Sequence, residues 1–279
     1  MKITCWGARG SIAVSGKEYV KYGGDTTCIE IRSNDGDIII IDAGTGIRKL
    51  GNKLLSSDNR AYSMLFTHAH WDHLMGFPFF KPIYMKGTKI DLYGCPYAQK
   101  SVGDMLSRSM MAPYFPVEFG QLQAQIESHS VCEEAFTIGP IRITTIQLSH
   151  PNRGIGYKFI EDGKSFVFLT DNELSHQHPG GGGFEDYLRF AADADLLVHD
   201  AEYSGDQYAI TKGWGHSLYT DALRLAMEAK VRQFGLFHHN QDRSDADLDR
   251  IVDDCSSIAK KGRSGLRCFA PYAGMDIAL

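Results

Sequence analysis

The chain has 279 residues, of which 43% are hydrophobic and 23% are charged, and its formal net charge is −5. This composition is typical of a folded globular protein and excludes a disordered one. The acidic balance argues against a protein wrapped in nucleic acid, because binding many phosphates requires a basic face. No apolar run has the length of a membrane-spanning helix. We therefore expect no membrane partner and no stable complex with nucleic acid.

The six cysteines are scattered along the chain and form no C-x-x-C pair. Such a spacing suits buried thiols in a reducing compartment better than a framework of disulfides. The first residues also lack the long apolar stretch of a signal peptide. We therefore predict a cytoplasmic protein with free thiols.

The first third of the chain is predicted to be rich in strands. Strands are expected at residues 3–6, 27–32 and 37–41, and the last contains four consecutive isoleucines, as a buried strand does. The spacing of isoleucine and leucine over 45–55 predicts a helix. A further buried strand is expected at 63–66.

Residues 94–128 show no clear periodicity and are rich in methionine and aromatic residues. We expect an irregular segment here, and packing into the core is the preferred interpretation. The alternative is a lid or a contact between subunits, because methionine-rich surfaces adapt to partners. A homodimer is therefore one of the expected arrangements.

The second half of the chain repeats the order of strands followed by helices. Strands are expected over residues 141–148, 154–160, 165–169, 196–198 and 234–237. Ser217 and Ser244 are each placed to cap a following amphipathic helix. Because no linker divides the chain, we predict one domain over 1–279, made of two similar halves with sheets inside and helices outside.

Metal-ligand side chains are concentrated directly after a predicted buried strand. The sequence THAHWDH covers residues 67–73 and contains His68, His70, Asp72 and His73. Burying four such side chains is costly without charge compensation, which a divalent cation supplies. Imidazole and carboxylate groups suit zinc or a similar ion. We interpret the motif as a metal site, in which the first two histidines reach one point and the remaining pair turns toward a second.

Further ligands are expected where other strands end, since sites in α/β folds lie where strands emerge at the edge of a sheet. His150, Asp171 and His238 each follow a predicted strand. Together with the motif they complete the ligand sets of two ions. His239, the neighbour of His238, is the alternative ligand at the last position.

On these residues the chain resembles the metallo-β-lactamase-fold hydrolases over nearly its whole length. The H-x-H-x-D-H motif and the order of the later strand-end ligands carry the resemblance. It implies an α/β fold, a four-layer αβ/βα sandwich with two mixed sheets inside and helices outside. It also implies two divalent metal ions, which we expect to be zinc, with manganese or iron as alternatives.

The resemblance further implies seven ligands, three for each ion and one that bridges them. They are His68, His70 and His150 for the first ion, Asp72, His73 and His238 for the second, and Asp171 as the bridge. Asp42, in the sequence IDAG, matches the acidic turn of such sites, whose side chain orients the metal ligands without binding the ion itself.

Two shorter stretches resemble the ribonuclease Z branch of these hydrolases. LVHDAE at 197–202 is similar to that branch's His-Glu-Ala-Thr stretch, and GHS at 215–217 is similar to its Gly-His-Ser. Asp200 stands where that branch has Glu, and Glu202 lies two residues later. Either acid is therefore a candidate for the same task.

His216 is predicted to act as a general acid. It follows a Gly-Trp-Gly turn that can carry a side chain into a cleft, and it is not needed as a ligand. A carboxylate nearby, from Asp200 or Glu202, would favour its protonated form. The expected catalytic residues are thus Asp72, His216 and Glu202. His199 and Asp200 are expected to lie next to the metal ligands without binding an ion.

The expected function is hydrolysis of small phosphodiesters such as cyclic nucleotides, by a hydroxide bound to the metal ions. Cleavage of precursor tRNA in the manner of ribonuclease Z is an alternative function. It is disfavoured by the acidic net charge and by the lack of an obvious long inserted arm, which that branch uses to hold tRNA. Two more functions fit the same centre, namely hydrolysis of a thioester or lactone, and metal-stabilised binding without catalysis.

Overall fold

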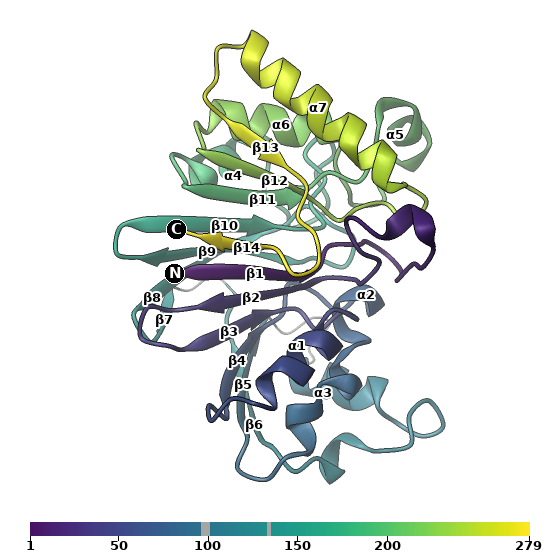
Figure 1. The fold of residues 1–279 in the computed structure, drawn as a ribbon, viewed down its shortest axis with the longest axis vertical. Helices are drawn as coiled ribbons and strands as arrows, with labels where there is room; N and C mark the ends of the chain where they lie inside the picture. Colours follow the sequence, from purple (N-terminus) through teal and green to yellow (C-terminus); the bar gives the residue numbers. More distant parts are fainter. Residues whose placement is uncertain (96–100, 133–134) are drawn as a thin grey trace.

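The computed structural model describes residues 1–95, 101–132 and 135–279, and its strands form two seven-stranded sheets (Figure 1). The first sheet has the order β14-β1-β2-β3-β4-β5-β6. Its strands are β1 (Lys2–Gly7), β2 (Cys28–Arg32), β3 (Ile38–Ile41), β4 (Ala61–Leu65), β5 (Lys89–Gly94), β6 (Gln125–Ser130) and β14 (Asp276–Ala278). Neighbours from β14 to β3 are antiparallel, whereas those from β3 to β6 are parallel.

The second sheet follows the same plan, with the order β13-β12-β11-β10-β9-β8-β7. Its strands are β7 (Phe136–Ile138), β8 (Ile141–Gln147), β9 (Ile155–Glu161), β10 (Lys164–Leu169), β11 (Leu196–Asp200), β12 (Gln233–Phe237) and β13 (Arg267–Phe269). Neighbours from β7 to β10 are antiparallel and those from β10 to β13 are parallel. The predicted pair of mixed sheets is confirmed.

Alternating side chains divide the core into layers. In β3, Ile39 and Ile41 pack between the two sheets, whereas Ile38 and Ile40 pack under α1 (Ile47–Leu54) and α3 (Val102–Ser109). The phenylalanines of β10 likewise face the first sheet, and Val167 packs under α4 (Phe184–Ala191), α6 (Tyr219–Glu228) and α7 (Asp245–Lys261). Helices therefore cover the outer face of each sheet, which gives the four layers expected of the α/β sandwich.

The remaining helices are short and lie mainly in connections. They are α2 (Trp71–Leu74), α5 (Gly205–Thr211) and the 3₁₀ helices η1 (Lys17–Tyr19), η2 (Phe77–Phe79), η3 (Lys81–Tyr84) and η4 (Phe119–Gln121). Within the described ranges, no helix combines the length and the apolar character needed to cross a membrane.

One of the two predicted helix caps is confirmed and the other is wrong. Ser244 caps α7, where its hydroxyl accepts a hydrogen bond from the backbone N–H of Asp247. Ser217 does not cap α6, which begins after Leu218. Its hydroxyl instead donates to the carbonyl oxygen of Asn172 at 2.5 Å. Ser217 therefore connects the loop before α6 to the loop after β10 by this hydrogen bond, and does not cap a helix.

The prediction of free thiols is wrong for two cysteines. Cys95 and Cys132 form a disulfide, with Cα atoms 4.6 Å apart. They come together because β5 and β6 are parallel neighbours, and Cys95 is the first residue after β5 and Cys132 the second after β6. The other four cysteines are free, as expected. The segment predicted to be irregular also contains α3 and β6; its residues 96–100 lie outside the described ranges.

Candidate metal centre

The candidate site lies where the strands of both sheets end, at one edge of the sandwich. His68 and His70 follow β4, and Asp171 follows β10. Asp171 has a φ of 52° and His238, directly after β12, has a φ of 56°. L-residues rarely adopt this left-handed conformation, and such strained backbone is concentrated at functional sites. The turns let side chains from both sheets converge on one point.

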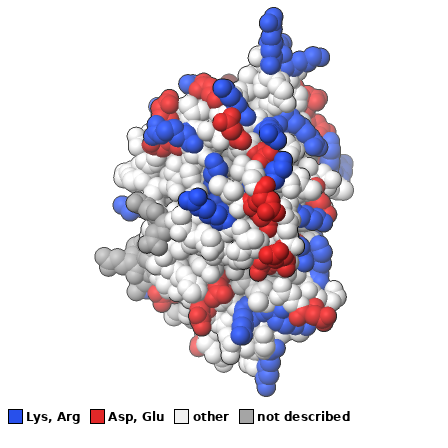
Figure 2. All heavy atoms as spheres, turned by 90° about the vertical axis from the view of Figure 1, so that its left-hand side faces the viewer, with Lys and Arg blue, Asp and Glu red and all other residues white. Residues whose placement is uncertain are grey.

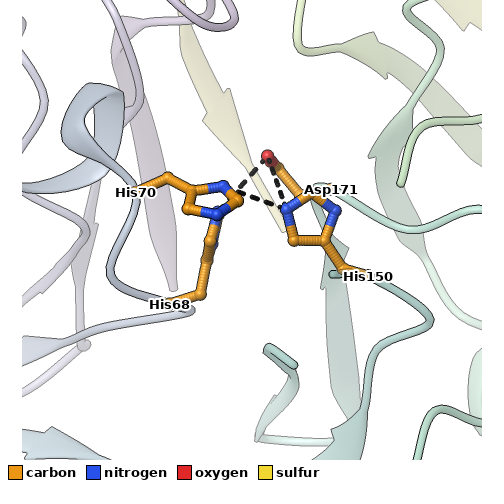
Figure 3. A group of neighbouring side chains, drawn as sticks. All are labelled: His68, His70, His150 and Asp171. Atoms are coloured by element: carbon orange, nitrogen blue, oxygen red, sulfur yellow. Dashed lines mark hydrogen bonds and ion pairs between the residues drawn. The ribbon is translucent and has the colours of Figure 1, made fainter. Parts of the chain in front are cut away.

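The first cluster contains three histidines and one carboxylate, His68, His70, His150 and Asp171. One donor atom from each lies within 4.8 Å of all the others. His150 Nε2 is 3.1 Å from His70 Nδ1, and His68 Nε2 is 3.5 Å from Asp171 Oδ2. Figure 3 shows the three imidazoles and the carboxylate close together, with His68 and His70 on one segment and His150 and Asp171 on two others. This donor set is suited to a divalent ion such as zinc.

The second cluster shares Asp171 with the first and adds Asp72, His73 and His238. His73 Nε2 lies 3.3 Å from one oxygen of each aspartate. His238 Nε2 lies 3.2 Å from Asp72 Oδ2 and 3.3 Å from Asp171 Oδ2. Asp171 therefore has an oxygen directed toward each group of histidines, as a bridging ligand requires. The structure thus brings together all seven residues predicted as ligands.

The ring nitrogens show that these residues fit metal ions. His68 Nε2 and His73 Nε2 are buried and have no hydrogen-bond partner among the described residues. The other ring nitrogen, Nδ1, is occupied in His73 by Asp42 at 2.7 Å, in His238 by Glu202 at 2.8 Å and in His150 by the carbonyl oxygen of Gly215 at 2.9 Å. Partners of this kind fix the ring and leave Nε2 for a metal.

In the first cluster, the charge states of the side chains favour the same interpretation. Burial and the neighbouring His73 hold the pKa of His68 well below its ordinary value, and burial lowers the pKa of His150 to about 3. These imidazoles are therefore neutral at pH 7, the form that binds metals. Burial opposes ionisation of Asp171, but His238 and His73 hold the pKa of this carboxyl well below its usual range. It is an anion placed between two sets of histidines.

Asp42, for which the resemblance implies a supporting role, contacts the start of the ligand motif. Its two oxygens accept hydrogen bonds from the backbone N–H of Thr67 at 2.8 Å and from the Thr67 hydroxyl at 2.7 Å. The same carboxylate bonds His73 Nδ1. Asp42 thereby fixes both the start of the motif and the orientation of one ligand.

His216 lies beside both clusters. Its ring is stacked on that of His238, with centroids 4.5 Å apart, and its centroid is 5.2 Å from that of His150. His216 Nδ1 is 2.6 Å from Asp200 Oδ2 and 3.4 Å from Glu202 Oε2. Burial alone would lower the pKa of His216, but these two carboxylates raise it to about 9. Asp200 is thus the direct partner of His216, whereas Glu202 is shared with His238.

Comparison with known proteins identifies the family. The model of the Beta-lactamase superfamily domain matches residues 38–239, which is more than half of the chain and includes every residue of both clusters. The chain belongs to the beta-lactamase superfamily. The resemblance to metallo-β-lactamase-fold hydrolases that the sequence indicates is therefore confirmed.

Three known proteins illustrate what the chain is similar to. A ribonuclease Z of Myxococcus xanthus is 24% identical over 77% of this chain and 81% of its own. The metallo-beta-lactamase fold protein YhfI from Bacillus subtilis has a TM-score of 0.72 and 18% identity, covering 99% of this chain and 98% of its own. A diphosphatase of the PhnP family has a TM-score of 0.68 and 17% identity, and the match covers 100% of this chain and 97% of the diphosphatase chain.

His199 and His239 are two further histidines that the sequence singles out. The ring nitrogens of His199 face the carbonyl oxygen of Asp200 and the side-chain amide of Asn172, and its supporting role stays a prediction. His239, the alternative to His238, is directed away and bonds the carbonyl oxygen of Pro271. The structure thus places His238, not His239, in the cluster.

Glu173 is a residue that sequence reasoning missed. Its buried carboxylate accepts hydrogen bonds from the Tyr208 hydroxyl and from His178 Nε2. It also accepts hydrogen bonds from the backbone N–H groups of Gly213 and Gly215, at 2.7 and 2.8 Å. This one side chain holds the loop that leads to His216. Its position two residues after Asp171 is the only sequence signal that could have drawn attention to it.

Gly215 itself is required by its surroundings. It has a φ of 97°, and a Cβ at this position would lie 2.1 Å from His150 Nδ1. A side chain would therefore displace a predicted ligand, so the Gly-His-Ser stretch is needed for space as well as for chemistry.

Proposed function

We propose that this protein is a metal-dependent hydrolase of small phosphodiesters such as cyclic nucleotides. The observation that carries the proposal is the position of Asp171, which both clusters of predicted ligands share. Sites with two ions are typical of enzymes that hydrolyse phosphodiesters. The diphosphatase of the PhnP family and the ribonuclease Z relative support a phosphorus-centred reaction. We also propose that residues 1–279 act as one domain.

The seven predicted ligands would hold the two ions, preferably zinc, with manganese or iron as alternatives. His68, His70 and His150 would serve one ion, Asp72, His73 and His238 the other, and Asp171 both. When bound, such ions polarise a phosphoryl oxygen and lower the pKa of water. Asp42 and Glu202 would keep His73 and His238 oriented through their Nδ1 atoms.

His216 would donate the proton that the leaving oxygen needs. Asp200 holds its Nδ1, so the ring is fixed and its Nε2 is the atom left for transfer. The pKa of about 9 means that the ring carries a proton at neutral pH. General acid assistance of this kind typically accelerates a reaction by about 10²–10⁴.

A small substrate suits the surface better than a folded RNA does. The net charge is −5. Figure 2 draws the left-hand side of Figure 1, away from α2 and the candidate centre, and on that face lysines and arginines are mixed with aspartates and glutamates. Binding many phosphates at once would require a basic field, which the negative net charge disfavours. The ribonuclease Z relative nevertheless makes cleavage of precursor tRNA the second candidate function.

A substrate panel tests the proposal. Purified protein loaded with zinc or manganese would be assayed on cyclic nucleotides, bis(p-nitrophenyl) phosphate, precursor tRNA, a thioester and a lactone. We expect hydrolysis of the first two, and its loss on adding a chelator. Faster turnover of the thioester or lactone than of any phosphodiester would contradict the proposal, and preference for precursor tRNA would favour the second candidate.

A further inference from the structure

Helix α2 separates the candidate metal centre from a second feature. Its Asp72 and His73 belong to the second cluster. Its other two residues, Trp71 and Leu74, line a cavity of about 650 Å³. The cavity lies between α2 and η2 on one side and α3 and the segment that follows α3 on the other. One short helix therefore contributes to both the metal centre and the cavity.

His70 lies in the chain between two residues that line the cavity. Of the seven predicted ligands, His70 alone is not buried. Both of its neighbours in the chain, Ala69 and Trp71, line the cavity. The cavity is therefore beside the one predicted ligand that is partly exposed, and a molecule bound in it would lie near the first cluster.

The walls of the cavity are mainly aromatic. Phe79 and Phe115 meet edge to face, with ring centroids 5.7 Å apart. Trp71 and Tyr114 also line the cavity, and 81% and 83% of their surface is exposed. Large exposed rings grouped in one concave place mark a binding site for a ligand that offers a flat or apolar surface.

Charge narrows the class of ligand. Among the described residues that line the cavity, Arg108 is the one with a charged side chain, and it forms no ion pair with any residue described. A cationic ligand would be disfavoured beside it, and a neutral aromatic ring or an anion would be accepted. Cavities of this size typically hold one small molecule.

We propose that this cavity, which we name the base pocket (Ala69, Trp71, Phe79, Arg108, Tyr114 and Phe115), binds the nucleobase of a nucleotide whose phosphate lies at the metal centre. The inference rests on the proposed function, since it assumes that phosphate binds beside the ligands. Bases stack on aromatic side chains in this manner irrespective of their identity. The substrate class is thereby narrowed to phosphodiesters that carry a base.

Isothermal titration calorimetry on the metal-loaded protein tests whether the base pocket binds a nucleobase, and it requires no chemical step. The probes are adenosine 5′-monophosphate, inorganic phosphate and hexyl phosphate. We expect the nucleotide to bind at least about ten-fold more tightly than phosphate, and more tightly than hexyl phosphate. Trp71→Ala and Phe115→Ala should each weaken nucleotide binding by about ten-fold, the typical effect of removing one stacking ring. Phosphate binding and metal content should stay unchanged.

Tyr272→Ala removes an exposed aromatic side chain outside the base pocket and is the matched control. It should leave the affinities for nucleotide and phosphate and the metal content unchanged. Equal affinity for the nucleotide and phosphate, or no nucleotide binding, would overturn the proposal. Hexyl phosphate bound as tightly as the nucleotide would overturn it in favour of an aliphatic ligand. If the ring-dependent preference is found but no phosphodiester is hydrolysed, the base pocket stands and the proposed reaction fails.

Discussion

The Glu173 carboxylate accepts a hydrogen bond of 2.8 Å from the backbone N–H of Gly215, the residue whose carbonyl oxygen bonds His150 Nδ1 at 2.9 Å. The peptide units on either side of Gly215 thus join a carboxylate near Asp171 to a predicted ligand. His216 is the next residue along the chain. Glu173 therefore positions both a ligand and the predicted proton donor, although it belongs to neither cluster.

Glu173→Gln should lower both stability and activity. The amide cannot accept the same four hydrogen bonds, and buried hydrogen bonds to a charged group are worth about 2 kcal/mol each. We expect the free energy of unfolding to fall by at least about 2 kcal/mol, measured by urea denaturation, and kcat to fall by about ten-fold or more. Glu185→Gln, at an exposed position in the first turn of α4, is the control and should change neither. A variant with wild-type stability and kcat would show that the loop does not depend on Glu173.

His216→Ala should affect substrates according to their leaving group. With an alkoxide leaving group, which must be protonated, the rate should fall by about 10²–10⁴. With a nitrophenolate leaving group, which needs no proton, the fall should be small. Metal content measured in parallel should equal that of the wild type. Equal losses on both substrates, or loss of metal, would assign His216 another role.

The pH profile of hydrolysis should depend on Asp200. The pKa of His216 is raised to about 9, so the protonated donor is present below this pH and is lost as the pH rises through it. The rate on an alkoxide substrate should therefore decline above about pH 9. Asp200→Asn removes one of the two carboxylates that raise the pKa, and the decline should move to lower pH. In His216→Ala this decline of the rate should be absent. A decline at the same pH as in the wild type, in both variants, would show that another group titrates.

His239 should make the fold sensitive to acid. Burial lowers its pKa to about 3, from an ordinary value of 6.5. Below pH 6.5 the unfolded chain gains a proton that the folded chain does not bind, so stability is lost as the pH falls from about 6.5 to 3. The slope from this residue is at most about 1.4 kcal/mol per pH unit. His239→Gln should reduce the slope of unfolding free energy against pH, whereas His176→Gln, at an exposed position, should leave it unchanged. The same slope in all three proteins would contradict the assignment.

The sequence predicts most of the fold because its signals are local. The isoleucines of β3 alternate between two core layers, and hydrophobic runs of this kind identify buried strands without knowledge of their neighbours. The ligand motif is local as well, since four candidate ligands occur within six residues after β4. Strand ends supply the remaining ligands.

The features that could not be predicted depend on contacts between distant segments. The Cys95–Cys132 disulfide follows from the pairing of β5 with β6, which no local pattern specifies. Glu173 resembles any loop acid until the loop at 213–215 folds over it. The choice between His238 and His239 is likewise decided in three dimensions, because only the first turns toward Asp171 at the end of β12.

Each chain is expected to hold two divalent ions with Asp171 between them. The most direct test is the metal content per chain, measured by mass spectrometry of protein purified without chelator and then equilibrated with zinc. We expect two ions in the wild type, about one in His73→Ala, and fewer than two in Asp171→Ala with most activity lost. A wild-type protein with one ion or none, or a His73→Ala variant that keeps two, would contradict it.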